Sequence, residues 1–186
     1  GLAAASERVR ALGWEFGVHD NPVILFADAP STDPRDALVR VDGSPGDGGI
    51  GGRWRMYQCC PAQMMKYVER NYPRLRDLFQ LNLVYSDQVA AVPLFECFSP
   101  DHPMTRGETI QAYKELIAYK HSQVQVVTSE ITDEWAVPIF DAMGTSVDVA
   151  HDFAYPIPLF ELVYRECVNL ESWPWGSMSV KDMINS

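Results

Sequence analysis

The sequence lacks most of the features that identify a common class of protein directly. It holds 15 lysines and arginines against 25 aspartates and glutamates, and the resulting net charge of −10 argues against a broad basic face for nucleic acid. No stretch approaches the roughly 20 apolar residues of a membrane helix, and no signal peptide is visible. We therefore expect neither a nucleic-acid nor a membrane partner, and the sequence leaves a cytoplasmic and a secreted location equally open.

Cysteine and histidine are scarce and follow no familiar ligand spacing. Of the four cysteines, Cys59 and Cys60 are adjacent while Cys97 and Cys167 are isolated, so there is neither a disulfide framework nor a C-x-x-C motif. The four histidines show no H-x-x-x-H spacing. These patterns predict buried or free thiols, no zinc site and no required cofactor.

Several motifs of nucleotide-binding proteins and hydrolases are also absent. The glycines of 43–52 do not lie between a strand and a helix, as a dinucleotide fingerprint requires, and no G-x-x-x-x-G-K-[ST] phosphate loop exists. No G-x-S-x-G elbow of a serine hydrolase is present. The chemistry, if there is any, must rest on other residues.

What is present is ordinary globular composition arranged as alternating helix and strand. The 186 residues are 47% hydrophobic and 22% charged, enough for one domain with a proper core, and no repeat or linker divides them. The order of elements and the near-continuous apolar strands predict an α/β fold with parallel strands. We expect helices at about 2–12, 61–79, 105–121, 133–142 and 156–170, strands at about 14–18, 81–86, 124–129 and 145–150, and long loops at 28–53 and 88–104.

Two helices carry particular local signals. Thr105 and Glu108 form a T-x-x-E capping box, which predicts a helix start there, with Tyr113 and Ile117 on the inner face. Pro73 lies inside the helix predicted at 61–79 and is expected to split it into two pieces.

Three of the apolar runs end on an acid, and this is the strongest functional signal. Asp20 follows "WEFGVH", Asp87 follows "LNLVYS" and Glu130 follows "VQVVTS". Because active sites of parallel α/β folds lie at the carboxyl ends of the strands, we expect the three acids to converge on one mouth. Carboxylate groups so placed support glycoside hydrolysis or metal binding. The alternative, in which each acid caps the next element, stays open.

Beyond the acids, several longer stretches resemble a known family. "GVHDN", "GGRW", "VYSDQVAAVPLFECFSPDHPMTR", "VVTSEITDEWAVP" and "YPIPLFELVYRECV" are similar to the catalytic region of TIM-barrel glycosidases related to the α-N-acetylgalactosaminidases of glycoside hydrolase family 129. That group resembles in turn the endo-α-N-acetylgalactosaminidases of family 101. The resemblance covers about residues 13–175.

This resemblance implies a partial (β/α)8 barrel and a retaining glycoside hydrolase for α-linked N-acetylgalactosaminyl or related sugars. In it Asp87 would be the nucleophile and Glu130 the acid/base. About four βα units fit in 186 residues, whereas a full barrel takes about 250 residues. Residues 1–186 are therefore expected to be one segment of a catalytic domain that needs the remainder of the barrel.

The supporting residues follow from the resemblance in the same way. His19 and Asp20 would bind sugar hydroxyls or a cation such as Ca²⁺, which is compatible with oxygen ligands. Trp54 and Trp135 would stack on a sugar face, although packing in the core explains them equally well. Arg165, with Glu166, stands where relatives are expected to carry a His-Asp pair, and would contact substrate. An inactive carbohydrate- or cation-binding barrel fragment and a plain structural α/β domain remain the alternatives.

Overall fold

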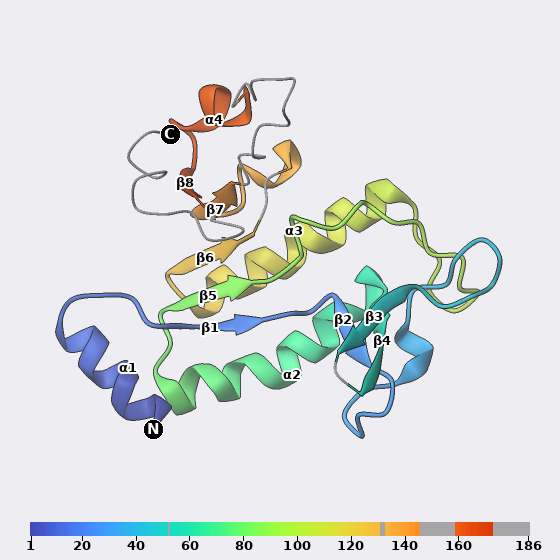
Figure 1. The fold of residues 1–186 in the computed structure, drawn as a ribbon, viewed down its shortest axis with the longest axis horizontal. Helices are drawn as coiled ribbons and strands as arrows, with labels where there is room; N and C mark the ends of the chain where they lie inside the picture. The colour runs from blue at the N-terminus through green and yellow to red at the C-terminus, as the bar shows by residue number, and fades with distance from the viewer. Residues whose placement is uncertain (52, 131–132, 146–158, 173–186) are drawn as a thin grey trace.

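A computed structural model describes residues 1–51, 53–130, 133–145 and 159–172, and it confirms the α/β class with a parallel sheet. A five-stranded parallel sheet has the order β1-β5-β6-β7-β8, and a three-stranded antiparallel sheet has the order β2-β4-β3 (Figure 1). The parallel strands are β1 (Gly17–Asp20), β5 (Leu83–Ser86), β6 (Val126–Ser129), β7 (Ala142–Thr145) and β8 (Asn169–Ser172). No helix in these described ranges is both long and apolar enough to cross a membrane.

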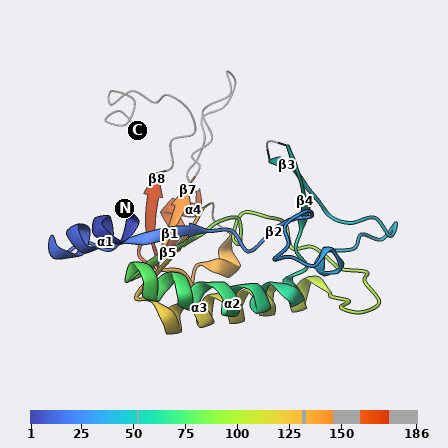
Figure 2. The same cartoon turned by 90° about the horizontal axis from the view of Figure 1, so that it is seen from below.

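The parallel strands follow one another in chain order, as in the wall of a (β/α)8 barrel. The strand direction turns steadily from β1 to β8, so the sheet curls (Figure 2). Helices α2 (Pro61–Phe79) and α3 (Arg106–Gln123) lie side by side on one face of the sheet. The main core forms between these helices and the strands, where Val84 and Val127 are fully buried.

Strand β1 pairs with β5 at a close approach that only glycine allows. The sequence pattern placed this strand at 14–18, but it runs from Gly17 to Asp20 and so includes the acid as its last residue. A Cβ atom on Gly17 would lie 2.3 Å from Leu83 Cδ2 and 2.7 Å from the Leu83 carbonyl oxygen. The register continues from Gly17 opposite Leu83 to Asp20 opposite Ser86, which brings the carboxyl ends of both strands to the same edge.

Helix α2 is continuous, and the predicted break at Pro73 is wrong. The helix begins with Pro61 in its first turn, where a missing N–H costs nothing, and ends at Gln80 in the left-handed region with φ 53°. A proline inside a helix costs about 3 kcal/mol through the lost hydrogen bond and ring clash. Packing of Met64, Val68 and Tyr72 into the core offsets this cost and keeps the helix intact.

The long loop predicted at 28–53 contains a 3-10 helix and a strand, and two further strands flank it, all missed by the sequence pattern. Strands β2 (Ile24–Phe26), β3 (Asp47–Gly51) and β4 (Trp54–Gln58) form the antiparallel sheet, with a 3-10 helix, η1 (Pro34–Asp36), between β2 and β3. This small sheet lies beyond the carboxyl end of β1 (Figure 1). The first strand-to-helix connection therefore folds over the edge of the parallel sheet where active sites of this fold occur.

The predicted start of α3 is confirmed in detail. Thr105 Oγ1 accepts a hydrogen bond from the Glu108 backbone N–H at 3.3 Å, and Glu108 Oε2 accepts one from the Thr105 backbone N–H at 2.8 Å. Tyr113 and Ile117 are buried on the inner face, as their spacing indicated. Near the amino terminus, helix α1 (Leu2–Ala11) also matches the prediction.

The carboxyl-terminal third departs most from the sequence prediction. The helix expected at 133–142 is replaced by a short 3-10 helix, η2 (Glu134–Ala136), and by strand β7, which starts at Ala142. Of the helix expected at 156–170, the described part is helical only in α4 (Leu159–Tyr164) and then becomes β8. Residues 146–150 of the strand expected at 145–150 lie outside the described ranges. Short apolar runs fit helix and strand equally well, and pairing decided between them.

The contact at Gly17 yields a direct test of the register. We expect Gly17→Ala to lower the free energy of unfolding by about 1–3 kcal/mol, because the added methyl group meets Leu83 backbone atoms that cannot move aside. Urea unfolding followed by circular dichroism measures this. Gly107→Ala is the matched control, since a Cβ there meets nothing within 4 Å. Equal stability of the two variants would contradict the close approach of β1 and β5.

Candidate active site

The Asp87 carboxylate is held at the carboxyl end of β5 by groups from the end of β1. Asn21 Nδ2 donates a hydrogen bond to Asp87 Oδ2 at 2.7 Å, and His19 Nε2 lies 3.2 Å from the same oxygen. The Asp87 backbone N–H donates to the Asp20 carbonyl at 2.9 Å. The carboxylate therefore has a fixed position with one oxygen engaged. Asn21 was missed by sequence reasoning, although it directly follows a strand-ending acid.

Glu130 lies beside Asp87. Burial raises the pKa of the Glu130 carboxyl, and the negative charge of Asp87 and a hydrogen bond between the two side chains raise this pKa further. His19 acts in the opposite direction on the same group, so it also lies close by. The register agrees, because Tyr85 pairs with Thr128 and two further residues along each chain lead to Asp87 and Glu130. The structure thus brings together the two acids to which the family resemblance gives the catalytic roles.

The turn after Asp87 has an unusual backbone. Gln88 has φ 64°, in the left-handed region that non-glycine residues rarely adopt. Its backbone hydrogen bond to Glu130 lowers the pKa of that carboxyl, against the effect of burial. Backbone strain of this kind concentrates at functional sites. Here the strained residue, Gln88, follows Asp87 in the chain and its backbone hydrogen-bonds to Glu130.

Asp20 does not join this pair, and the prediction that three acids converge is wrong for it. Side chains of a strand alternate between faces, so Asp20 shares the face of Ser86 while His19 and Tyr85 share the other. Asp20 Oδ2 lies 2.7 Å from Lys120 Nζ, and Lys120, which is completely buried, also donates to Ser86 Oγ at 2.9 Å. Asp20 therefore faces the helices rather than the Asp87 side of the sheet.

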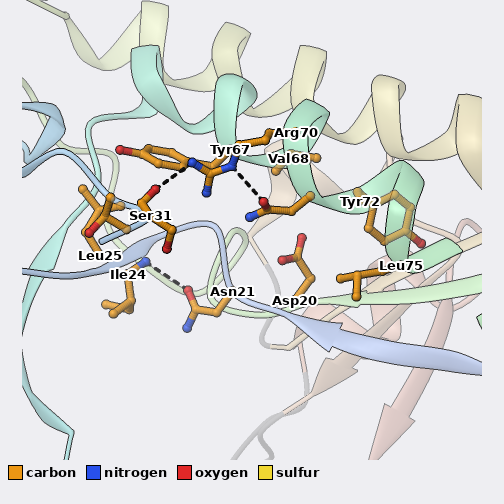
Figure 3. A pocket seen from close by; sticks show the side chains of 12 residues that line it. Asp20, Asn21, Ile24, Leu25, Ser31, Tyr67, Val68, Arg70, Tyr72 and Leu75 are labelled. Atoms are coloured by element: carbon orange, nitrogen blue, oxygen red, sulfur yellow. Dashed lines mark hydrogen bonds between the residues drawn. The ribbon is translucent and has the colours of Figure 1, made fainter. Parts of the chain in front are cut away.

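A small pocket borders Asp20 on this helix side. It lies between the end of β1, the start of β2 and α2, and Figure 3 shows Asp20, Tyr72 and Leu75 at one end with Arg70 at the other. The Arg70 guanidinium donates to the Ser31 carbonyl and to its neighbour Asn71. Neither Asp87 nor Glu130 lines this pocket, so it is separate from the acid pair.

Lys120 is the second residue that sequence reasoning missed. It lies in the last turn of α3 and follows Tyr113 and Ile117 at helical spacing, so its position on the inner face could have been read from the sequence. Burial lowers the pKa of its ammonium group, and the charge of Asp20 opposes that shift. An ion pair in this position fixes the end of β1 to α3.

The remaining predicted substrate-binding residues are spread over different environments. Trp54, on β4, is 42% exposed, and the Arg53 guanidinium lies 4.6 Å from its ring centroid. Trp135 instead packs against the main core, with its ring stacked on Tyr113 at 5.7 Å, as expected of a core residue. Arg165 is exposed after α4, with its Nε 3.4 Å from Glu166.

One ligand cluster was not expected. Among the described residues, Cys60, Cys97 and His102 are the group whose ligand atoms lie close enough together to hold a metal ion, and no third acid joins Asp87 and Glu130 in such a group. These residues are 37 and 5 positions apart in the sequence (97 − 60 and 102 − 97), so no ligand motif marks them. Cys60 and Cys97 are buried free thiols, as the sequence predicts, but their closeness to each other and to His102 was not predicted.

The parallel α/β fold is similar to that of TIM-barrel glycosidases of known structure. The chain is similar to ligand-free α-N-acetylgalactosaminidase NagBb from Bifidobacterium bifidum, with 25% identity, a TM-score of 0.81 and coverage of 96% of this chain and 31% of that chain. Its GalNAc complex gives 27% identity and a TM-score of 0.78 over 89% of this chain and 28% of that chain.

A second group of similar structures shows the fold alone. The α-galactosidase TtGalA from Thermus thermophilus, in complex with stachyose, is 15% identical, with a TM-score of 0.66 over 100% of this chain and 45% of that chain. No protein-family model and no curated protein sequence matches the chain. The chain spans less than a third of the α-N-acetylgalactosaminidase chains, 31% and 28% of their length.

The contact between the acids yields a testable titration. We expect the pKa of Glu130 to lie above the ordinary glutamate value, so that the proton stays on until a higher pH than in a free side chain. Asp87→Asn removes the neighbouring negative charge and should lower this pKa. Carbon-13 NMR of the labelled Glu130 carboxyl measures both, and Glu115→Gln, on the exposed side of α3, is the control. An unchanged Glu130 titration in Asp87→Asn would show that the two groups do not interact.

The Lys120 ion pair yields a stability test. Removing one partner of a buried pair leaves an uncompensated charge, so Lys120→Met should lower the free energy of unfolding by about 3 kcal/mol. Adding Asp20→Asn to that variant should restore part of the loss, because the stranded carboxylate is gone. A double-mutant cycle by urea unfolding measures the coupling. Strictly additive effects of the two substitutions would contradict the pairing.

Proposed function

We propose that the chain is part of a retaining glycoside hydrolase that cleaves α-linked N-acetylgalactosaminyl or related glycosides. The observation that carries the proposal is the contact between Asp87 and Glu130 at the carboxyl ends of neighbouring parallel strands. Retaining enzymes hold two carboxyl groups about 5–5.5 Å apart, closer than the roughly 6.5–9.5 Å of inverting enzymes. Carboxyl groups that follow directly paired strands, with the charge of Asp87 raising the pKa of Glu130, favour the shorter separation of the retaining class.

In the proposed reaction Asp87 is the nucleophile and Glu130 the acid/base. The Asp87 carboxylate attacks the anomeric carbon while the bond from that carbon to the glycosidic oxygen breaks, and Glu130 gives its proton to the leaving oxygen. A covalent glycosyl-Asp87 ester results. Glu130, now ionised, takes a proton from water, whose oxygen attacks the anomeric carbon and releases Asp87. The sugar keeps its anomeric configuration after two displacements.

The electrostatics of the pair support this assignment of roles. A general acid must carry a proton near neutral pH, and burial together with Asp87 raises the pKa of Glu130 in the required direction. Asp87 Oδ2 accepts a hydrogen bond from Asn21 and lies 3.2 Å from His19 Nε2, and these contacts hold the nucleophile in place.

The substrate class rests on similarity and on the residues around the pair. Solved structures of NagBb from Bifidobacterium bifidum include complexes with GalNAc and with Gal-NHAc-DNJ. The sequence motifs resemble those of family 129, which supports the same substrate class. His19 is 62% exposed beside Asp87 and is suited to a sugar hydroxyl, while Trp54 offers an exposed ring. For Asp20, Trp135 and Arg165 we propose a secondary role in substrate binding. Asp20 and Trp135 already contact Lys120 and Tyr113 inside the protein.

The proposed enzyme includes more than this chain. Residues 1–186 would be a segment of its catalytic barrel. In this segment β1 and β8 are the edge strands of the parallel sheet, and further strands would pair with them to close the barrel. The reaction as written uses only the two carboxyl groups, so it requires no cofactor. A calcium ion near the acids stays a prediction from the sequence.

Substitution of the two acids tests the proposal. In the protein that carries this segment, Asp87→Asn and Glu130→Gln should each lower kcat on p-nitrophenyl α-N-acetylgalactosaminide, Glu130→Gln by about 10²–10⁴-fold. Glu115→Gln, an exposed acid on α3, should leave kcat unchanged. Proton NMR of the first product should show the α-anomer.

Two results would overturn this function. Formation of the β-anomer would exclude double displacement, and wild-type kcat in Asp87→Asn would exclude Asp87 as the nucleophile. Binding of N-acetylgalactosamine without any turnover of the glycoside would favour the alternative of an inactive carbohydrate-binding barrel.

A further inference from the structure

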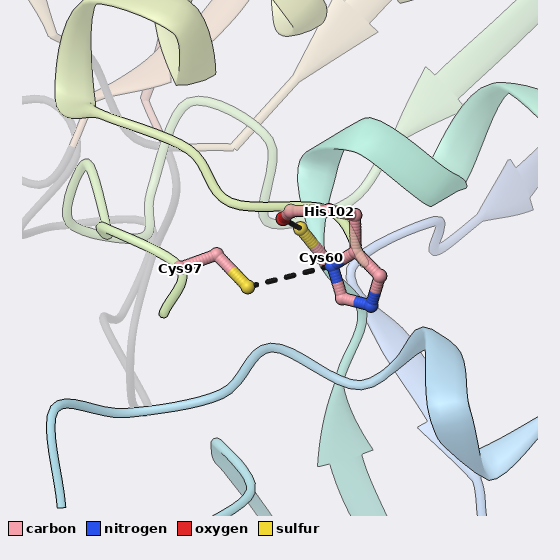
Figure 4. A group of neighbouring side chains, drawn as sticks. All are labelled: Cys60, Cys97 and His102. Carbon is pink, nitrogen blue, oxygen red and sulfur yellow. Dashed lines mark hydrogen bonds between the residues drawn. The ribbon is translucent and has the colours of Figure 1, made fainter. Parts of the chain in front are cut away.

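Three sulfur and nitrogen ligands from separate segments meet in the interior, away from the acid pair. Cys60 lies at the start of α2, and Cys97 and His102 lie in the connection between β5 and α3. The ligand atoms of all three are within 4.8 Å of one another (Figure 4). All three residues are buried, Cys60 completely. Packing alone does not require a histidine beside two buried thiols, so the cluster calls for another explanation.

The protonation of His102 follows from its second contact. His102 Nε2 lies 2.9 Å from the Arg35 carbonyl oxygen, which can only accept a hydrogen bond, so Nε2 carries the proton. The neutral ring then has its lone pair on Nδ1, which points toward Cys97 Sγ at 3.5 Å. Metal-bound histidines characteristically donate their other ring N–H to a carbonyl or carboxylate in this manner.

The distance between Cys97 Sγ and His102 Nδ1 matches a tetrahedral zinc site, and the other ligand atoms lie within 4.8 Å of one another. With Zn–S distances of about 2.3 Å and Zn–N distances of about 2.0–2.1 Å, neighbouring ligand atoms lie about 3.6 Å apart. The distance from Cys97 Sγ to His102 Nδ1 is 3.5 Å. Cys97 Sγ also accepts a hydrogen bond from the Val39 backbone N–H at 3.4 Å, which fixes the position of the sulfur.

We propose that Cys60, Cys97 and His102 bind a zinc ion. Thiolate and imidazole donors select zinc over the hard cations calcium and magnesium, which take oxygen ligands. Two S–H protons leave when the metal binds, and the two thiolates balance the charge of Zn²⁺. The fourth tetrahedral position takes a ligand other than the His, Cys, Asp and Glu side chains of the described residues.

The role of the site is to tie two long connections together. Cys60 follows β4 in the connection from β1 to α2, while Cys97 and His102 belong to the connection that begins at Asp87. Arg35, in η1, holds the histidine ring from a third position. Both connections leave the carboxyl ends of parallel strands, so the zinc ion would fix loops around the candidate active site without taking part in the reaction.

Two metal-free arrangements compete with this proposal. Without metal, the Cys60 thiol donates to the His102 carbonyl at 3.7 Å and the Cys97 thiol to His102 Nδ1, which satisfies the cluster by hydrogen bonds alone. Under oxidation, Cys60 and Cys97 are also near enough for a disulfide to be considered. Both alternatives leave the protein without zinc, so metal content separates them from the proposal.

The experiment measures metal content and ligand identity together. The protein is produced with zinc sulfate in the medium, dialysed, and analysed by inductively coupled plasma mass spectrometry, with about one zinc per chain expected. Cys60→Ser, Cys97→Ser and His102→Gln should each remove most of the zinc. Cys59→Ser is the matched control, because Cys59 is adjacent and equally buried but lies outside the cluster.

A second measurement covers variants that fail to fold. Cobalt exchanged into the wild-type protein should give the near-ultraviolet absorption of thiolate bound to Co²⁺. Absence of both zinc and this absorption, with Cys60 and Cys97 found as free thiols or as a disulfide by mass spectrometry, would overturn the proposal. So would zinc that survives all three substitutions. Neither measurement depends on glycosidase activity, so this proposal and the proposed function can fail separately.

Discussion

The parallel register of β1, β5 and β6 determines which side chains meet at the edge of the sheet. Gly17 packs directly against Leu83, and from that contact the pairing runs to Asp20 opposite Ser86. Because side chains alternate along a strand, a slip of one residue would turn His19 toward the helices and Asp20 toward the other face of the sheet. The placement of His19 and Asn21 beside Asp87 therefore depends on a glycine at the other end of β1.

The two faces of this edge have different electrostatic environments. On the helix side, Asp20 and the buried Lys120 form an ion pair supported by Ser86. On the other side, Asp87 has a hydrogen-bond donor, but Glu130 has a carboxylate as its neighbour. The first arrangement neutralises a charge inside the protein, whereas the second raises the pKa of the Glu130 carboxyl. Only the second is suited to the acid/base role proposed for Glu130.

The sequence predicted those features that depend on neighbours along the chain. The capping box at Thr105 and the acids ending β5 and β6 are local signals, and they are confirmed as structure. The prediction that Asp20 faces the other two acids was wrong. The face on which Asp20 lies depends on where β1 starts, and the close packing at Gly17 sets that start. Pro73 was misread because tertiary packing outweighs a local cost of about 3 kcal/mol.

The cysteines show a different limit of sequence reasoning. Ligand motifs detect residues brought together within one turn or hairpin, whereas Cys60 and Cys97 meet only after two connections fold over the same sheet edge. The first connection is rich in glycine, proline and aspartate, the second carries Pro93, Pro100 and Pro103, and the two meet in a small second core around Leu38 and the two cysteines. Ordering such long loops costs conformational entropy that contacts between them must offset. A cross-link at the point where the loops touch would supply that order next to the loop that begins at Asp87, and the strands of the barrel would then not have to hold the loops alone.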